Sequence, residues 1–461
     1  MPPPRPHRRL RRLALALAAL LVAFASAPVA TAADTEARAK KPRGVIVNTA
    51  AASPGYTLYS PLELQRTYLI ELDGTVAHSW KTSTQPGLIQ YLLPNGHLLR
   101  AGNLKTLGVW KEGRGAGGRV EELDWDGNVV WQYEIADDVA MQHHDIAPLP
   151  NGNVLILAWE RKTGNEALAA GRNPKLLSSK ELWPEKIGEY SPATKSIVWE
   201  WHVWDHLVQE RDPSLANYGD VSAHPEKIDL NYVLPGSTGD ADWNHANAVA
   251  YNAELDQLMI SSRSFSELWI VDHGITTEEA RGPAGDLLFR YGNPAAYGKG
   301  GPVDQQLFVQ HDPYWIPAGY PGASEILVFS NGLPEIREYS SVEQVKPTME
   351  NGQYMKDANG VFTSTSVTVY PKKTKGALFS AIISSAQRFP NGNTLVTYGP
   401  QGLMVEVDES GKIVWEYENT RFTVRKDTPK ETGAGVPIQP WWTFRAKRYD
   451  PAYSGLADLN P

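Results

Sequence analysis

Two short motifs recur along this chain, and one copy of each stands between residues 123 and 152. The first is Leu123-Asp-Trp-Asp-Gly-Asn-Val-Val-Trp131, in which an acidic glycine turn leads into a strand that ends in Trp. The second is Gln142-His-His-Asp-Ile-Ala-Pro-Leu-Pro-Asn-Gly152, in which a strand leads into a Pro-Asn-Gly turn. Because Asn and Gly supply the positive φ that a tight hairpin requires, both motifs predict β-hairpins.

Further copies of both motifs alternate along the chain. The first returns at 72–80, 190–199 and 407–415, with weaker copies at Val271-Asp272 and Glu338-Tyr339, and the second returns at 93–96 and 389–392. Two hairpins per unit are typical of the four-stranded blades of a propeller. The six copies of the first motif therefore predict an all-β, six-bladed β-propeller. The regular spacing disfavours the alternative, a pair of β-sandwiches.

The length of the chain predicts long loop insertions on one face of this propeller. Its 461 residues provide about 70 per blade after the leader, whereas simple blades need only ~40–45. The expected insertions are 161–189, 203–240, 275–306 and 341–380. The predicted organisation is a signal peptide at 1–32, an N-terminal segment at 33–60 that leads into the first blade, the catalytic propeller at 61–450 and a C-terminal tail at 451–461.

The first 32 residues have the pattern of an export signal. A positive region is followed by an apolar run from Leu13 to Ala25 and by the small residues Ala30-Thr-Ala32 at a cleavage site. The run is shorter than the ~20 residues that a spanning helix needs. We expect a secreted, extracytoplasmic protein, exported by the Sec or the twin-arginine route, with no membrane association once the signal is removed. A signal anchor is the alternative.

Composition excludes several classes of function. The 44 Lys and Arg against 52 Asp and Glu give a net charge of −8, which argues against a nucleic-acid partner. The absence of Cys excludes disulfides, thiolate metal sites and a cysteine nucleophile. There is no P-loop, and Gly113-Arg-Gly-Ala-Gly-Gly118 precedes a hairpin rather than a helix, so we interpret it as a flexible inter-strand loop. We expect neither a cofactor nor a metal.

Three histidines have similar positions relative to the hairpin turns. His144 and His245 each stand seven residues before an Asn, and His311 stands five residues before Ile316, as His144 does before Leu149. Equivalent positions in a propeller are related by rotation about its axis, so these side chains should converge there. On a strand, only one of His143 and His144 can face the channel. We expect the remaining histidines to be structural or exposed: His78, His97, His202, His206, His224 and His273.

Arg263 is the fourth candidate site residue, because it follows the strand that pairs with the one carrying His245. A guanidinium beside imidazoles suits a tetrahedral anion such as sulfate or phosphate. Asp145 and Asp312 each follow one of these histidines and can either orient an imidazole or cap a loop. Asn247 and Asp312 are the candidates for supporting the bound substrate.

These residues resemble those of the bacterial arylsulfotransferases, secreted enzymes that use a phenolic sulfate ester as donor. The resemblance extends over about residues 43 to 450 and is most specific in Asp242-Trp-Asn-His-Ala-Asn247, with Ile260-Ser-Ser-Arg-Ser264 downstream. It implies a six-bladed propeller and ping-pong transfer of a sulfuryl group through a sulfohistidine, without a nucleotide donor. By position, His311 matches the nucleophile, His245 and Arg263 match supporting residues, and His144 matches the remaining histidine.

The chain departs from the family pattern in two places. Family members can carry a disulfide near the active site, whereas this chain has no Cys, and Ser330 stands where Asp is expected.

The implied partners are a small phenolic sulfate donor and a phenolic acceptor, and either His144 or His245 can serve as base for the acceptor. Two alternatives are a metal-dependent propeller hydrolase of the lactonase or phosphoesterase type and a non-catalytic binding propeller.

Overall fold

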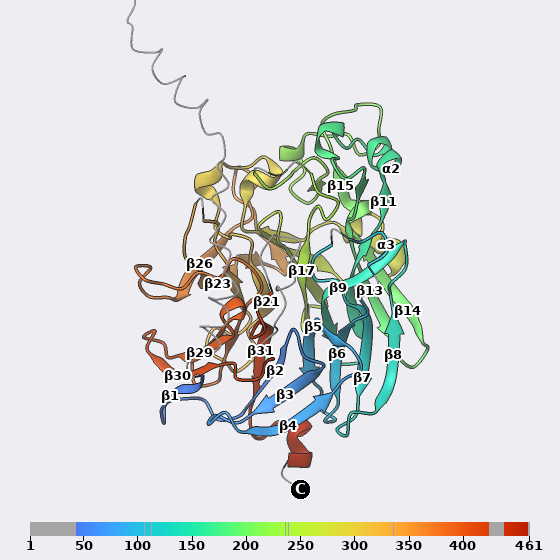
Figure 1. Ribbon diagram of the computed structural model, residues 1–461. Helices are drawn as coiled ribbons and strands as arrows, with labels where there is room; N and C mark the ends of the chain where they lie inside the picture. Colours follow the sequence, from blue (N-terminus) through green and yellow to red (C-terminus); the bar gives the residue numbers. More distant parts are fainter. Residues whose placement is uncertain are drawn as a thin grey trace, which may run out of the picture.

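The strands of the computed structural model form six antiparallel sheets arranged as a six-bladed β-propeller, as the sequence predicts (Figure 1). The structure describes residues 43–459 except 106, 112, 236, 238, 335 and 424–437. The predicted signal peptide lies outside the described residues. Among the described helices, none is long and apolar enough to cross a membrane.

The first three sheets, given from the innermost strand outward, are built as follows. The first contains β31 (Thr443–Tyr449), β2 (Tyr56–Pro61), β3 (Arg66–Ile70) and β4 (Val76–Lys81). The second contains β5 (Gln85–Leu92), β6 (Leu98–Asn103), β7 (Gly118–Leu123) and β8 (Val129–Glu134). The third contains β9 (Ala140–Pro148), β10 (Val154–Glu160), β13 (Glu185–Ser191) and β14 (Ser196–His202).

The remaining sheets follow the same order. The fourth contains β17 (Ala246–Asn252), β18 (Gln257–Ser262), β19 (Glu267–Asp272) and β20 (Phe289–Tyr291). The fifth contains β21 (His311–Trp315), β22 (Ile326–Ser330), β23 (Ser341–Pro347) and β26 (Ser364–Tyr370). The sixth contains β27 (Ser385–Arg388), β28 (Thr394–Tyr398), β29 (Leu403–Val407), β30 (Ile413–Glu418) and β1 (Gly44–Asn48).

Two strand exchanges close the ring. The C-terminal β31 is the innermost strand of the first sheet, and the N-terminal β1 pairs with β30 at the outer edge of the sixth. The innermost strands β31, β5, β9, β17, β21 and β27 contact one another in that cyclic order. Side chains on these strands therefore meet around the central axis.

Apolar side chains fill the spaces between neighbouring blades. One buried cluster, for example, joins Leu155 and Trp201 of the third sheet to Ile260 and Trp269 of the fourth. Three of the four tryptophans that end the clear copies of the repeated hairpin also link blades through the indole N–H. That of Trp80 donates to the carbonyl of Asp124 in the next blade. Trp199 and Trp415 make the same kind of bond, to Ile275 and Leu72, whereas the indole N–H of Trp131 donates to Glu122 in its own blade. The recurrence of Trp at the end of the hairpin thus has a structural reason.

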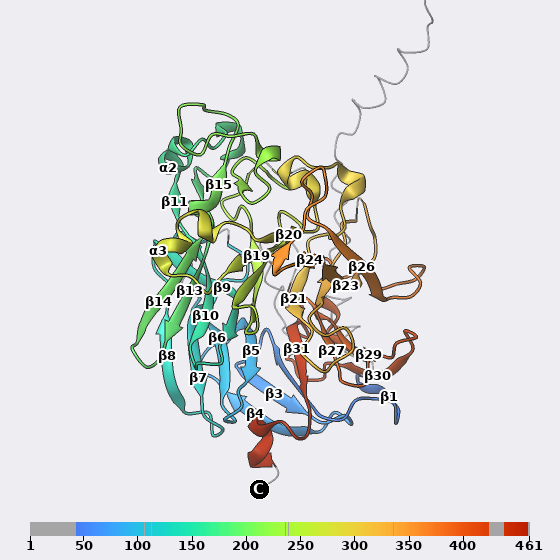
Figure 2. The same cartoon turned by 180° about the vertical axis from the view of Figure 1, so that it is seen from behind.

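The insertions carry the smaller elements. Three lie between β10 and β13, between β14 and β17, and between β19 and β21. The first ends before the predicted limit of 189, because β13 begins at Glu185, and the predicted range 275–306 contains the blade strand β20. In Figure 1, α2 (Gly164–Ala169), β11 (Lys162–Thr163) and β15 (Leu207–Val208) stand together at the end of the molecule opposite the C-terminal η8 (Ser454–Leu459), and Figure 2 shows the same from behind. The other short elements are β12 (Glu181–Leu182), β16 (Ile228–Asp229), β24 (Met349–Glu350), β25 (Gln353–Tyr354), α3 (Thr277–Ala280), η1 (Pro174–Leu176), η2 (Val203–His206), η3 (Val221–Ala223), η4 (Pro283–Gly285), η5 (Pro294–Tyr297), η6 (Pro302–Asp304) and η7 (Gly399–Gln401).

Two predictions about the fifth blade are wrong. Glu338-Tyr339 lies in the loop between β22 and β23 and not in the outer hairpin, which β23 and β26 form. The range 341–380 therefore contains two blade strands and is not one insertion. The outer hairpin lacks the glycine turn and terminal Trp of the other copies, so no local motif in the sequence marks its position.

Candidate active site

Left-handed backbone residues interrupt the inner strands where the histidines lie. His144 and His245 have φ values of 49° and 44°, whereas in β21 the left-handed residue is Asp312, at 50°. The predicted shared position is therefore right for His144 and His245 and is displaced by one residue for His311. The turn between β21 and β22 spans 316–325 and is longer than the Pro-Asn-Gly turns, so the spacing of His311 to this turn is not equivalent to that of His144.

His144, and not His143, faces the other candidate residues. The His144 ring centroid lies 4.7 Å from that of His245 and 6.2 Å from that of Phe444. His143 stacks on Trp159, with ring centroids 4.0 Å apart and an interplanar angle of 8°. Its Nδ1 lies 2.8 Å from Nδ1 of His144, and its Nε2 is buried without a partner among the described residues.

This bond between the two histidines assigns their protons. A buried N–H without an acceptor is rarer in proteins than an unpaired acceptor. The His143 proton therefore belongs on Nδ1, from which it is donated to Nδ1 of His144. His144 then carries its own proton on Nε2, which has no hydrogen bond to a described residue and is a donor available to a bound anion.

His245 forms a dyad with the end of an insertion loop. Its Nδ1 lies 2.5 Å from Oδ2 of Asp242, and the Asp242 carboxylate also accepts the indole N–H of Trp159 at 2.9 Å. Burial alone would raise the pKa of Asp242, but His245 and these hydrogen bonds bring that pKa below its usual value. The carboxylate is thus charged and accepts the Nδ1 proton of His245, which leaves Nε2 of His245 available for proton transfer.

His311 is held by Asn331, the residue after Ser330. Nδ1 of His311 lies 2.7 Å from Oδ1 of Asn331, and the Asn331 amide donates to the carbonyls of Ser380 and Ile383. These two donations fix the orientation of the amide, so His311 must donate its Nδ1 proton. The lone pair is then on Nε2, which accepts the N–H of Ile383 at 3.2 Å. Asn331 supplies the support that the sequence left in doubt, while Ser330 bonds Arg337.

Burial holds the imidazoles of His144 and His311 in their neutral form. It lowers the pKa of His311 well below the ordinary value, and the positive charge of Arg263 lowers it further. Burial, followed by the neighbouring histidines, has the same effect on the pKa of His144. A neutral imidazole with a free lone pair is the nucleophilic form of histidine.

Arg263 lies directly beside His245. Its backbone N–H donates to the carbonyl of His245 at 3.2 Å, and its side chain has no hydrogen bond or ion pair to a described residue. Burial and then the charge of Arg114 lower the pKa of Arg263 to about 10, which still leaves it positively charged. Its fork of N–H donors is open to an anion.

Arg114 belongs to the glycine loop, which the sequence analysis did not connect with the site. The carbonyl of Gly115 accepts the backbone N–H of His144 at 3.0 Å, and Ala116 forms a bridge with His143. Gly115 packs against the His144 ring so closely that a Cβ there would stand 2.6 Å from both ring nitrogens. The loop lies between strands, as expected, but it also covers the site, and only its run of small residues hinted at such close packing.

The predicted supporting residues do not contact the imidazoles. Asp145 and Asp312 both bind Arg445, at 2.8 Å and 3.2 Å, and the carbonyl of Asn247 accepts from the same guanidinium. The Asn247 side chain donates to the carbonyl of Gln310, the residue before His311. These residues support the backbone under the histidines, and Arg445 is a second residue that the sequence analysis missed.

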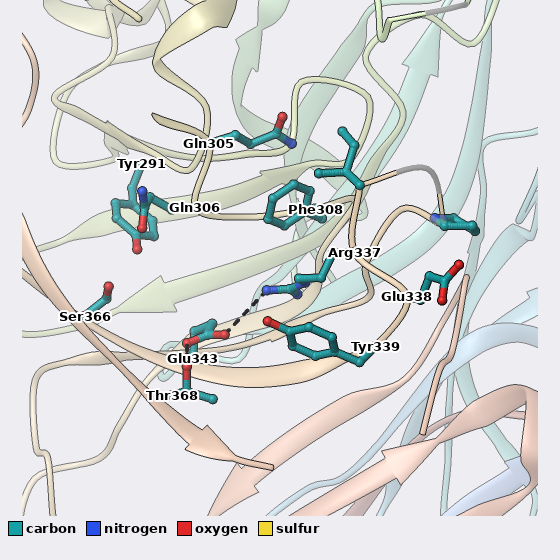
Figure 3. A pocket seen from close by; sticks show the side chains of 12 residues that line it. Tyr291, Gln305, Gln306, Phe308, Arg337, Glu338, Tyr339, Glu343, Ser366 and Thr368 are labelled. Atoms are coloured by element: carbon teal, nitrogen blue, oxygen red, sulfur yellow. Dashed lines mark hydrogen bonds and ion pairs between the residues drawn. The ribbon is translucent and has the colours of Figure 1, made fainter. Parts of the chain in front are cut away.

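A separate pocket of about 780 Å³ lies between the fourth and fifth blades (Figure 3). Arg337 lies between the rings of Phe308 and Tyr339 and points toward Glu343, 3.8 Å away. Its guanidinium is already engaged, and Glu338 and Glu343 make the walls acidic. This pocket therefore does not suit a sulfate group, and none of the four candidate site residues lines it.

The described side chains do not form a metal site: no group of three or more His, Asp or Glu residues among them is placed to hold a metal ion. The donor geometry gives the metal-hydrolase alternative no support.

Similar solved structures include a protein of unknown function from Bacteroides caccae, with 11% identity and a TM-score of 0.44 over 80% of this chain and 94% of that one. A virginiamycin B lyase from Staphylococcus aureus has 9% identity and a TM-score of 0.38 over 82% of this chain and 85% of that one. A protein from Lactobacillus plantarum has 8% identity and a TM-score of 0.41 over 86% of this chain and 99% of that one. These likenesses are too weak to inform function. A comparison with curated proteins found no match. The family model described as Arylsulfotransferase (ASST) matches residues 65–433, well over half of the sequence. The chain therefore belongs to the arylsulfotransferase family of sulfotransferases.

Proposed function

We propose that this enzyme transfers a sulfuryl group from a phenolic sulfate ester to a phenolic acceptor through a covalent intermediate on Nε2 of His311. The observation that carries the proposal is the hydrogen bonding of His311. Asn331 accepts a hydrogen bond from the Nδ1 proton, so the lone pair is on Nε2, where attack on sulfur replaces the 3.2 Å hydrogen bond from the N–H of Ile383. Arg263, with an open guanidinium, contributes positive charge beside that lone pair.

In the first half-reaction, Nε2 of His311 attacks sulfur. The N–S bond forms as the bond between sulfur and the phenolic oxygen breaks, and the electron pair leaves with that oxygen. The leaving phenolate takes a proton from Nε2 of protonated His245. Arg263 and the Nε2 proton of His144 donate to the nonbridging oxygens, where negative charge is held in a water-poor channel.

In the second half-reaction, neutral His245 removes the proton of the acceptor phenol. The phenolic oxygen attacks sulfur, the N–S bond breaks and its electron pair returns to Nε2 of His311. His245 is the better base of the two candidates, because Asp242 stabilises its protonated form whereas His144 has only His143 as a partner. Both half-reactions balance without a cofactor. Export by the predicted leader at residues 1–32 remains part of this proposal.

The test is transfer from 4-nitrophenyl sulfate to phenol, with and without a chelator. We expect nitrophenol release that depends on phenol, resists the chelator and is lost in His311→Ala, while the exposed His224→Ala serves as a matched control. Mass spectrometry of the peptide that contains His311 should detect one added sulfuryl group when the acceptor is omitted. Release that requires a metal would favour the hydrolase, and a folded protein without release would favour a binding propeller.

A further inference from the structure

The C-terminal strand β31 places one buried cation directly beneath the candidate site. Arg445 is 2% exposed, and its Nη1 lies 2.8 Å from Oδ2 of Asp145 and 3.2 Å from Oδ1 of Asp312. Its Nη2 donates to the carbonyl of Asn247 at 3.0 Å. We propose that Arg445 is a positioning residue that holds the three histidine-bearing strands in register, so that the site is assembled only when β31 closes the ring.

Each of the three contacts of Arg445 is made by a residue one or two positions after a candidate histidine. Asp145 follows His144, Asp312 follows His311, and Asn247 stands two residues after His245. The backbone beside each contact includes a left-handed residue other than glycine, namely His144, His245 or Asp312. Such conformations are unfavourable and persist only where surrounding contacts fix them. Arg445 contributes to fixing all three at once, because its planar fork presents several donors.

The same strand also forms a wall of the site. The ring of Phe444 lies 6.2 Å from that of His144 and 6.3 Å from that of His311, measured between centroids. Asp145 additionally accepts the backbone N–H of Val249 on β17 at 3.1 Å, so β9 and β17 are joined beside Arg445. A strand from the far end of the chain therefore fixes the spacing of the histidines.

Arg445 also acts on the histidines by its charge. It is one of the groups that lower the pKa of His144 and of His311, after burial and nearer groups. The charged and titratable groups that surround these two rings are His143, His245, Arg263, Asp145, Asp242, Asp312 and Lys447. Removal of Arg445 leaves Asp145 and Asp312 without their shared cation, so the pKa of His311 should rise.

The experiment compares Arg445→Met and Arg445→Lys with Arg448→Met. Arg448 lies three residues further along β31, is 3% exposed and pairs with Glu406, but it contacts no candidate site residue. It is thus a matched control for the loss of a buried ion pair on the closing strand. Steady-state kinetics with 4-nitrophenyl sulfate and phenol are measured across pH, below the unfolding temperature of each variant.

For Arg445→Met we expect kcat to fall about 10²-fold, the effect of a misplacement near 1 Å, and the acid limb of kcat/KM to move to higher pH. Arg445→Lys keeps the charge but not the fork, so its acid limb should stay in place and kcat should recover in part. Arg448→Met should lose thermal stability and keep the kcat and pH profile of the wild type. If Arg445→Met and Arg448→Met lose activity in parallel with unchanged pH profiles, the proposal is overturned.

Two further measurements keep the proposal testable if Arg445→Met does not fold or the wild type shows no transfer. Asp312→Asn removes one negative charge beside Arg445, so the acid limb should move to lower pH, and an unchanged kcat and pH profile would contradict the proposal. Because the kinetic test rests on the proposed function, NMR titration of 15N-histidine-labelled protein provides a readout independent of activity. The pKa of His311 should rise in an Arg445 variant that lacks the charge and not in Arg448→Met.

Discussion

The replacement of Arg263 by Met tests the chemistry of the site with little disturbance of the fold. The Arg263 side chain has no hydrogen bond or ion pair to a described residue, so its removal leaves no described residue without a bonding partner. We expect a stability change of about 1 kcal/mol or less, since no named cause of a larger loss applies. Loss of one preorganised donor at a developing anion costs about 10²–10³ in kcat, and loss of the positive charge places our expectation at the upper end.

The pH dependence of the same variant gives a second, independent magnitude. Arg263 is the largest contributor after burial to the lowered pKa of His311. Without it, the pKa of His311 rises, more of the imidazole is protonated at low pH, and the nucleophile is lost there. The ratio of wild-type to variant kcat/KM should therefore be larger at pH 5.5 than at pH 8, by up to about tenfold for each unit of pKa shift.

The assay is nitrophenol release from 4-nitrophenyl sulfate with phenol as acceptor, together with thermal unfolding of each variant. Arg263→Lys keeps the charge and loses the fork, and we expect it to recover part of the activity. Arg281→Met, which removes an exposed ion pair with Glu278, is the control and should behave as the wild type. A kcat/KM for Arg263→Met within threefold of the wild type would refute the anion-binding role of this guanidinium.

Three further outcomes follow from local geometry. In Asp242→Asn, the proposed base His245 loses its carboxylate partner, so turnover should fall about 10²–10⁴-fold. Stopped flow should still detect the first burst of nitrophenol, because this leaving group needs little help from an acid. Loss of the burst would argue against the role of His245 as base for the acceptor. Gly115 and Gly152 have nearly equal φ, 83° and 84°, but an alanine Cβ would collide with the His144 ring only at Gly115. Each alanine variant should lose about 1 kcal/mol of stability from the left-handed backbone, and only Gly115→Ala should lose activity. Equal activity in the two variants would contradict the close contact. Although burial opposes it, the hydrogen bond of His202 to Glu160 and the carboxylate of Glu200, 3.9 Å away, raise the pKa of His202 to about 9. The stabilisation is present below pH 6.5 and is lost as pH rises through about 9, so urea unfolding of the wild type and His202→Gln should differ most near pH 6; a pH-independent difference would count against the pairing.

Turn chemistry made most of the fold predictable. The glycine and Pro-Asn-Gly turns are local signals, since the positive φ values of Gly96, Gly152 and Gly392 depend only on the residues of each hairpin. The fifth blade was the exception, because its outer strands β23 and β26 are joined by a long segment that contains its own small hairpin. Without a tight turn, the sequence has no local signal for where the outer hairpin begins.

The candidate site was predictable as a set of residue types but not as a set of contacts. His144, His245, His311 and Arg263 follow from spacing and resemblance, and the structure brings them together around Phe444 and β31. Asn331, Arg114 and Arg445 could not be found in this way. Each acts across a long sequence separation, and Arg445 in particular meets Asp145 from 300 positions away.

The sequence by itself determined the number of blades, the alternation of hairpins and the side chains available for chemistry. These properties depend on neighbours in the chain, whose backbone preferences are intrinsic. Only the tertiary structure decided which nitrogen of each histidine carries a proton and which charges surround it. The physical reason is that protonation and orientation depend on burial and on hydrogen-bond partners such as Asp242 and Asn331, and those contacts exist only after the ring has closed through β31.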